Sequence, residues 1–146
     1  MTALENAALR QLALKVLAQR AGPAAGAETL AAAVQRTYDD LARVSAPLIG
    51  QVGVDALTGR ALHLVQREYP WLVRMREPEQ AEGPFAQVIF CLDRQDPGVA
   101  AEAAGAVFAT LTRLLVTFIG EPLTAGLLRK AWPEAVSDAS AQETEA

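Results

Sequence analysis

The sequence predicts an all-α fold: a compact bundle of about six helices built around two long central helices. Of its 146 residues, 51% are hydrophobic but only 5% are aromatic. The apolar content is therefore mostly Ala, Leu and Val, and Ala and Leu are strong helix formers. Two long stretches also carry apolar or small residues at alternating spacings of four and three, which is typical of a helix packed along another helix.

The first helix is predicted over residues 3–20. Leu9, Leu12 and Val16 lie at helical spacing there, and "AGPAAGA" follows. Gly22 can adopt the left-handed conformation that ends many helices, and Pro23 cannot continue one.

The second helix is predicted over residues 27–49. Its apolar seam, the row of positions that should face another helix, consists of Leu30, Val34, Thr37, Leu41, Val44 and Leu48. Pro47 lies within this pattern and removes a backbone donor, which predicts a bend near the end of the helix. A third helix is predicted over residues 55–68, with Asp55 as its N-cap and with its end before Tyr69 and Pro70.

The segment that follows, "WLVRMREPEQAEGPF", is rich in Pro, Gly and Glu and predicts a surface loop anchored by Trp71 and Leu72. Residues 84–94 are ambiguous between helix and strand. We favour a helix because Pro84 suits a first helical position and no other segment offers itself as a partner strand.

The last long helix is predicted over residues 97–119, with Asp96 as N-cap and Pro97 at the first position. Its seam consists of Ala100, Ala104, Val107, Leu111, Leu114 and Phe118. Gly120 ends it, Pro122 starts a short sixth helix and Pro133 ends that helix. We expect one domain over residues 1–136 and a disordered acidic tail over residues 137–146.

Two stretches of the chain are alike. "LARVSAPLIGQVGVDALTGRALHLVQREYP" and "LTRLLVTFIGEPLTAGLLRKAWP" both run Leu-x-Arg, five residues, Ile-Gly, Leu-Thr and aromatic-Pro. They align if the first copy has four extra residues between Gly50 and Leu57 and three between Leu62 and Tyr69. We interpret each as a helical hairpin with a tight corner at Ile-Gly; the alternative is chance similarity between segments rich in Leu and Ala.

The charge and the cysteine content limit the partners and the cellular environment that we expect for the protein. The net charge of −4 argues against a nucleic-acid partner. Cys91 is the single cysteine and has apolar neighbours, which indicates a buried thiol in a reducing, cytoplasmic environment. No signal peptide is evident, and Arg113 interrupts the most apolar window, so we expect a core helix there and no membrane association.

The residues suited to catalysis are sparse. His63 is the only histidine. A zinc site of several His and Cys ligands cannot be assembled around it, and a Ser-His-Asp triad would leave no second histidine. We expect a solvated surface histidine, with phosphotransfer or haem ligation as alternatives. Asp39 and Asp40 are adjacent and diverge on a helix. We therefore expect no enzyme activity, no cofactor and no metal.

One basic cluster stands out in this acidic chain, formed by Arg60, His63, Arg67, Arg74 and Arg76. The first three lie on one helical stripe. The cluster is either a solvated face whose positive charge is offset by Glu68, Glu77 and Glu79, or a surface that docks an acidic protein partner.

These features together suggest a non-enzymatic helical protein-interaction module in a bacterial regulatory or signalling assembly, with a protein partner and homodimerisation. The alternative is a small-molecule sensor with an apolar pocket between helices. Ala104 and Gly105, near Val107 and Phe108, are the positions where such a pocket is expected.

Overall fold

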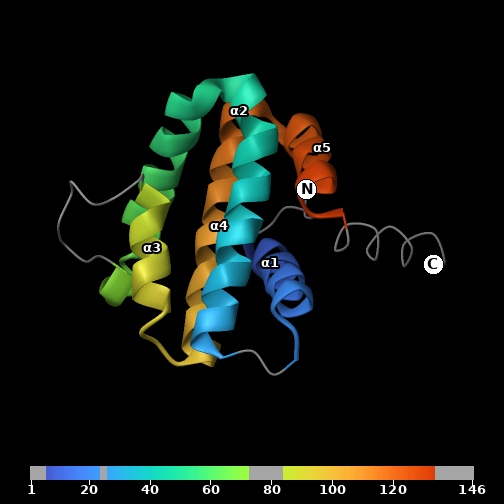
Figure 1. The fold of residues 1–146 in the computed structure, drawn as a ribbon. Helices are drawn as coiled ribbons and strands as arrows, with labels where there is room; N and C mark the ends of the chain where they lie inside the picture. The colour runs from blue at the N-terminus through green and yellow to red at the C-terminus, as the bar shows by residue number, and fades with distance from the viewer. Residues whose placement is uncertain (1–5, 24–25, 73–83, 134–146) are drawn as a thin grey trace.

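The computed structural model describes residues 6–23, 26–72 and 84–133, and these residues form an all-α bundle without a strand. The predicted fold class is confirmed. The elements are α1 (Asn6–Ala21), α2 (Ala27–Val65), the 3₁₀ helix η1 (Pro70–Leu72), α3 (Pro84–Leu92), α4 (Pro97–Ile119) and α5 (Glu121–Ala131). Figure 1 shows α2 and α4 as the long helices at the centre.

Helix α2 consists of two arms joined at Gly50. This residue has φ 81° and ψ 156°, which is far from helical, so the chain turns there. We refer to residues 27–49 as the N-terminal arm and to residues 51–65 as the C-terminal arm. The C-terminal arm begins directly after the glycine, and Asp55 therefore lies inside it. The prediction of Asp55 as an N-cap was wrong, because glycine alone provides the corner; the Asp55 carboxylate instead accepts a hydrogen bond from Gln51 at 3.0 Å.

A second corner of the same kind joins α4 to α5 at Gly120, which has φ 95° and ψ 159°. Each corner glycine follows an isoleucine, Ile49 or Ile119. Both predicted hairpins are thus present. Helix α5 starts at Glu121, one residue before the predicted Pro122.

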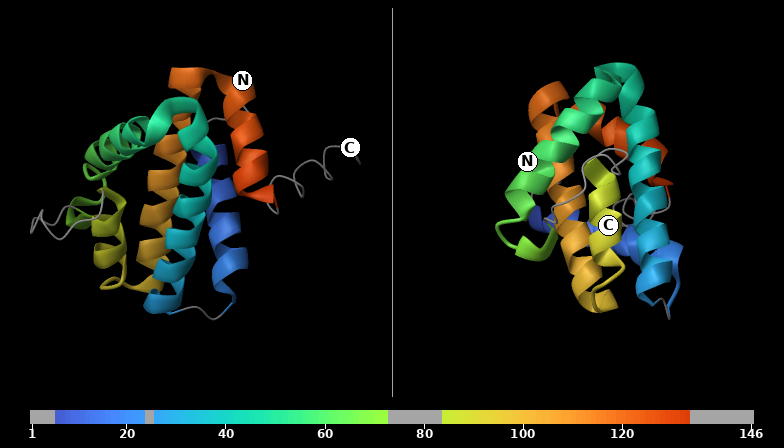
Figure 2. Two further views of the ribbon diagram at one scale, coloured as in Figure 1. Left: turned by 45° about the horizontal axis from the view of Figure 1, so that its top comes forward. Right: turned by 60° about the vertical axis from the view of Figure 1, so that its left-hand side comes forward.

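The two hairpins lie side by side. The N-terminal arm of α2 and α4 run in the same direction and pack along each other, while the C-terminal arm and α5 fold back on opposite sides (Figures 1 and 2). A shorter helix precedes each hairpin, α1 the first and α3 the second. Helix α1 packs most extensively on α4, and α3 packs on α2, so each leading helix covers the hairpin of the other unit. This exchange ties the two halves into one bundle.

A row of aromatic rings runs through the core. Phe85 of α3 stacks on Tyr38 with centroids 4.0 Å apart and also contacts Phe108 at 5.9 Å. Phe108 in turn meets the edge of Trp132 at 5.6 Å. The indole Nε1 of Trp132 donates to the carbonyl of Thr37 at 3.1 Å, which connects the end of α5 to α2. Tyr38 and Phe108 each lie twelve residues before a corner glycine.

Both predicted seams are buried along their first four positions, in α2 at Leu30, Val34, Thr37 and Leu41, and in α4 at Ala100, Ala104, Val107 and Leu111. The last position of each seam was predicted wrongly. Leu48 is 53% exposed and Phe118 is 62% exposed. The two long helices reach their corners at the same end of the bundle, and no helix among the described residues extends beyond the corners to cover these side chains.

Several local predictions are confirmed. Gly22 has φ 94° after α1, residues 84–92 are helical, Asp96 caps α4 by accepting from the backbone N–H of Gly98 at 3.0 Å, and Cys91 is buried. Leu72, the last residue of η1, is buried. The rest of the predicted loop (residues 73–83) and the predicted tail (residues 137–146) lie outside the described residues.

Candidate interaction surfaces

The most unusual surface of the molecule is apolar and lies at the end of the bundle that carries both corners. We call it the apex surface and define it by Leu48, Val52, Phe118 and Leu123, which are 53%, 84%, 62% and 53% exposed. Only two other large hydrophobic side chains in the described part of the chain are comparably exposed, Phe90 and Val99. Both corners lie at the top of the bundle in Figure 1.

The two corners build the apex surface in the same way. Leu48 and Phe118 each lie two residues before a corner glycine, and Val52 and Leu123 lie two and three residues after one. Residues 44–54 contain no charged side chain, and residues 114–124 contain one, Glu121. Four exposed large apolar side chains beside two nearly uncharged corners are unusual on a small domain, and extended apolar patches are in general typical of interaction sites.

Two residues of the basic stripe predicted from the sequence, Arg60 and His63, lie on the C-terminal arm of α2, and Arg67 lies in the turn that follows it. Arg60, His63 and Arg67 are all exposed, and none of them makes an ion pair in the described structure. Arg74 and Arg76, the other two predicted docking residues, lie outside the described residues. We call Arg60, His63 and Arg67 the basic stripe.

Glu68 does not neutralise the basic stripe, because it is bound elsewhere. Its carboxylate accepts from the Arg10 guanidinium of α1 at 2.8 Å. This hydrogen bond lowers the pKa of Glu68 and raises the pKa of Arg10. The pair connects α1 to the turn that follows α2.

A groove of about 280 Å³ lies between the N-terminal arm of α2 and α3. Its lining is formed by Glu28, Ala31, Ala32, Gln35, Ile89, Phe90 and Asp93. Four of these residues are apolar and two, Glu28 and Asp93, carry carboxylates; Arg94 stacks over the ring of the lining residue Phe90, 4.1 Å from its centroid. Neither Glu28 nor Asp93 has an ion-pair partner within residues 6–23, 26–72 and 84–133. We call this the acidic groove.

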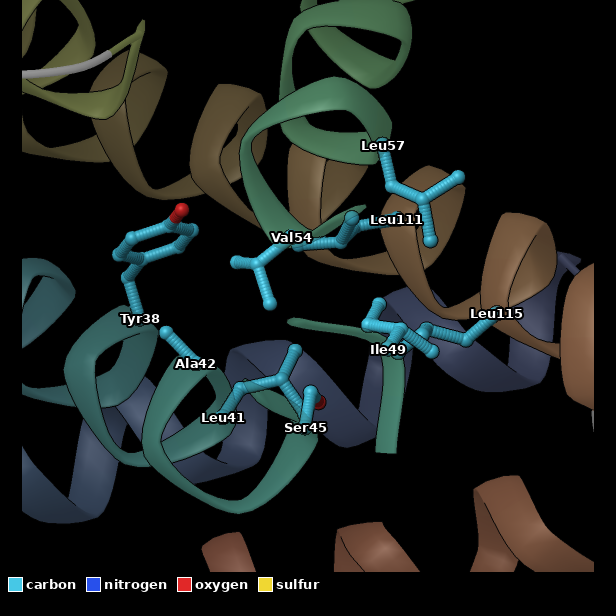
Figure 3. Close-up of a pocket in the computed structure, with 9 residues that line it drawn as sticks. All are labelled: Tyr38, Leu41, Ala42, Ser45, Ile49, Val54, Leu57, Leu111 and Leu115. Carbon is cyan, nitrogen blue, oxygen red and sulfur yellow. The ribbon is translucent and has the colours of Figure 1, made fainter. Parts of the chain in front are cut away.

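A small, partly open cavity lies between the two arms of α2 and α4 (Figure 3). Its volume is about 10 Å³, room for roughly one water molecule. The lining residues are Tyr38, Leu41, Ala42, Ser45, Ile49, Val54, Leu57, Leu111 and Leu115. The buried Ser45 hydroxyl finds no hydrogen-bond partner in the protein.

The remaining polar group at this cavity is the Tyr38 hydroxyl, which shares a 2.9 Å hydrogen bond with Thr58. Burial raises the pKa of Tyr38, and the Thr58 hydrogen bond partly opposes that shift. The site expected for a ligand pocket, near Ala104 and Gly105, is occupied by protein instead: a Cβ at Gly105 would lie 3.4 Å from Leu14 of α1.

The other candidate chemical groups have structural contacts. Asp39 accepts from Gln35 at 2.9 Å, and Asp40 binds Arg20 at 2.9 Å and Arg43 at 3.3 Å. Among the described residues, no group of three or more His, Cys, Asp or Glu side chains is arranged to hold a metal ion. Helix α4 has the length and hydropathy of a membrane span, but 61% of its most apolar window is buried inside the bundle, as expected for a core helix.

The chain matches no protein-family model, and no similar protein was found among curated proteins or solved structures. The apex surface was missed from the sequence, although a signal was present: both seams continue to within two residues of a corner glycine, where no partner helix remains to cover them.

Proposed function

We propose that this protein is a non-enzymatic helical interaction module that binds a partner protein through its apex surface. The carrying observation is the exposure of Leu48, Val52, Phe118 and Leu123 together at one end of the bundle. In this proposal the module recruits its partner into a regulatory or signalling assembly. The composition of the chain suggests a bacterial setting.

Burial of the apex side chains would supply substantial binding energy. Burying a Leu, Val or Phe side chain contributes about 1.5–3 kcal/mol when the side chain starts fully exposed, and roughly half of that at the exposures seen here. Large apolar side chains at the centre of an interface are the kind of anchors that dominate binding, and Phe118 would be the largest of the four.

The internal architecture does not account for this exposure. Neither corner needs a bulky side chain beside it, because the turn is made by the glycine backbone. Polar residues at positions 48, 52, 118 and 123 would leave the buried seam contacts unchanged. The apex residues therefore serve contacts outside the bundle in this proposal.

The test uses two charge substitutions on the apex and one matched control. Val52→Asp with Phe118→Asp places carboxylates in the apex surface, while Val99→Asp changes an exposed valine at the opposite end of α4, 39% exposed. We expect the tagged wild-type protein and Val99→Asp to retain the same partner from host extract, and the apex double variant to lose it with its thermal unfolding unchanged. Equal retention by all three proteins would refute the proposal.

A second candidate is the small-molecule sensor, which one observation favours. The Ser45 hydroxyl is buried without a protein partner in an otherwise apolar cavity (Figure 3). A ligand larger than water requires outward movement of the C-terminal arm about Gly50. Native mass spectrometry of the purified protein tests this: a copurified small molecule that is lost in Ser45→Val supports a sensor, and a spectrum of protein alone counts against it.

A further inference from the structure

We propose that the protein forms a two-fold symmetric homodimer in which the basic stripe of each copy docks onto the acidic groove of the other. This inference concerns a different surface from the apex and extends the proposed function. The occupant of the groove is a second copy of this chain, and the basis for choosing it is charge complementarity within one molecule.

The two surfaces carry opposite and unused charge. Arg60, His63 and Arg67 form no ion pair in the described structure, and the same holds for Glu28 and Asp93 across the groove. The acidic residue nearest the stripe in sequence, Glu68, is held by Arg10. Arg94 follows Asp93 but stacks over the Phe90 ring, 4.1 Å from its centroid, and forms no ion pair with either carboxylate in the described structure. In this proposal each surface finds its counter-charge on a second copy.

Asp93 is placed where the monomer does not benefit from it. It follows Leu92, the last residue of α3, and its backbone N–H still bonds to the carbonyl of Ile89 at 3.1 Å. A negative charge at the C-terminal end of a helix is repelled by the helix dipole. An arginine from a second copy would turn this repulsion into a paired contact.

The elements that carry the two surfaces lie on one side of the bundle. Figure 2 (right) shows both arms of α2 and α3 on the side turned toward the viewer. In a two-fold dimer formed through this face, the stripe of one copy meets the groove of the other, and the reciprocal contact forms at the same time. The contact is therefore closed and does not propagate into a filament.

The chemistry of the two surfaces agrees. Two arginines, Arg60 and Arg67, would face two carboxylates, Glu28 and Asp93. Arginine side chains can lay their aliphatic stems over apolar surface, here Ala31, Ala32 and Ile89, while the guanidinium groups pair with carboxylates at the rim.

Sedimentation velocity on two charge-reversed variants tests the proposal. The stripe-reversed variant is Arg60→Glu with Arg67→Glu, and the groove-reversed variant is Glu28→Lys with Asp93→Lys. We expect the wild type to dimerise and each variant alone to weaken the dimer by about tenfold or more, because every contact becomes repulsive. An equimolar mixture of the two variants should restore a dimer, since each acidic stripe then faces a basic groove.

The controls separate this interface from other causes. Circular dichroism melting establishes that both variants fold, and Arg113→Glu with Arg129→Glu reverses exposed arginines elsewhere on the bundle without changing the dimer. A wild-type protein that stays monomeric at millimolar concentration overturns the inference, as does a mixture that fails to dimerise. Loss of the dimer in Val52→Asp with Phe118→Asp would place the second copy at the apex and also overturn it. A different result refutes the proposed partner binding: equal retention of the partner by the wild type, the apex double variant and Val99→Asp. The two proposals can therefore be refuted independently.

Discussion

Gly50 and Gly120 have the same backbone conformation, with φ and ψ of 81° and 156° in one and 95° and 159° in the other. This region of φ and ψ is essentially restricted to glycine. Each glycine reverses the chain between a long and a short helix and leaves a bulky side chain two residues before it exposed. The apex surface is thus a direct product of two equivalent corners.

Alanine at either corner should destabilise the protein. A Cβ at Gly50 meets nothing within 4 Å, and at Gly120 the nearest atom is 3.9 Å away, so the cost is one of backbone conformation alone. We expect Gly50→Ala and Gly120→Ala each to lower the free energy of unfolding by about 1–3 kcal/mol in urea titrations.

Gly59→Ala is the matched control for the corner glycines. Gly59 is exposed within the C-terminal arm, has no positive φ and has open space around its Cβ position. Alanine there should stabilise the protein by about 0.5–1 kcal/mol. If the corner variants behaved like Gly59→Ala, the assigned corner conformation would be wrong.

Trp132→Phe should weaken the connection between α5 and α2. The substitution removes the Nε1–H that donates to the Thr37 carbonyl and shrinks a side chain that is 1% exposed. We expect a loss of about 2 kcal/mol in the free energy of unfolding. Trp71→Phe, at a half-buried tryptophan whose ring contact is with Tyr69, should cost less than half as much; equal costs would contradict the role assigned to the Thr37 bond.

The Arg10–Glu68 pair should contribute stability that depends on pH. The pKa of Glu68 is lowered in the folded protein, so its contribution is complete above the unfolded pKa of about 4.3 and is lost as the pH falls through the lower folded value. Both side chains are substantially exposed, at 31% and 52%, and we therefore expect Glu68→Gln to cost only about 0.5 kcal/mol at pH 7 and almost nothing at pH 3.

Chemical denaturation of the single and double variants measures this pair. In an Arg10→Gln background, Glu68→Gln should have little effect at either pH, because the charge partner is absent. A pH-independent cost in both backgrounds would mean that Glu68 acts through packing and not through its charge.

Ser45→Ala should leave the protein unchanged or stabilise it by about 1 kcal/mol, because it removes a buried hydroxyl without a protein partner. Thr58→Val provides the contrast: it removes a buried hydroxyl that is bonded to Tyr38 and should destabilise the protein by about 1 kcal/mol. Thermal unfolding distinguishes the two. Destabilisation of both to the same extent would show that the Ser45 hydroxyl is satisfied in solution.

Much of the fold could be predicted from local sequence signals. Asp96 and Pro97 fixed the start of α4, and the periodicity of Leu30, Val34, Thr37 and Leu41 identified a buried face correctly. These signals act within one helix, where capping and side-chain spacing have direct physical consequences.

The errors arise where tertiary arrangement decides. Periodicity placed Leu48 and Phe118 in the core, since spacing along one helix carries no information on where the neighbouring helix ends. Asp55 was predicted as a cap because the positive φ at Gly50, which allows the next arm to begin at once, cannot be read from an isolated glycine. The basic stripe was found from spacing, whereas the acidic groove depends on α2 and α3 packing together.

Site-specific photo-crosslinking in the host cell tests partner binding at the apex most directly. A benzophenone amino acid at position 118 or 52 would lie in the apex surface, and one at position 99 would lie at the opposite end of α4. We predict that positions 118 and 52 capture the same partner protein and that position 99 does not. Capture at position 99 alone, or equal capture at all three positions, would contradict an apex that serves as the binding surface.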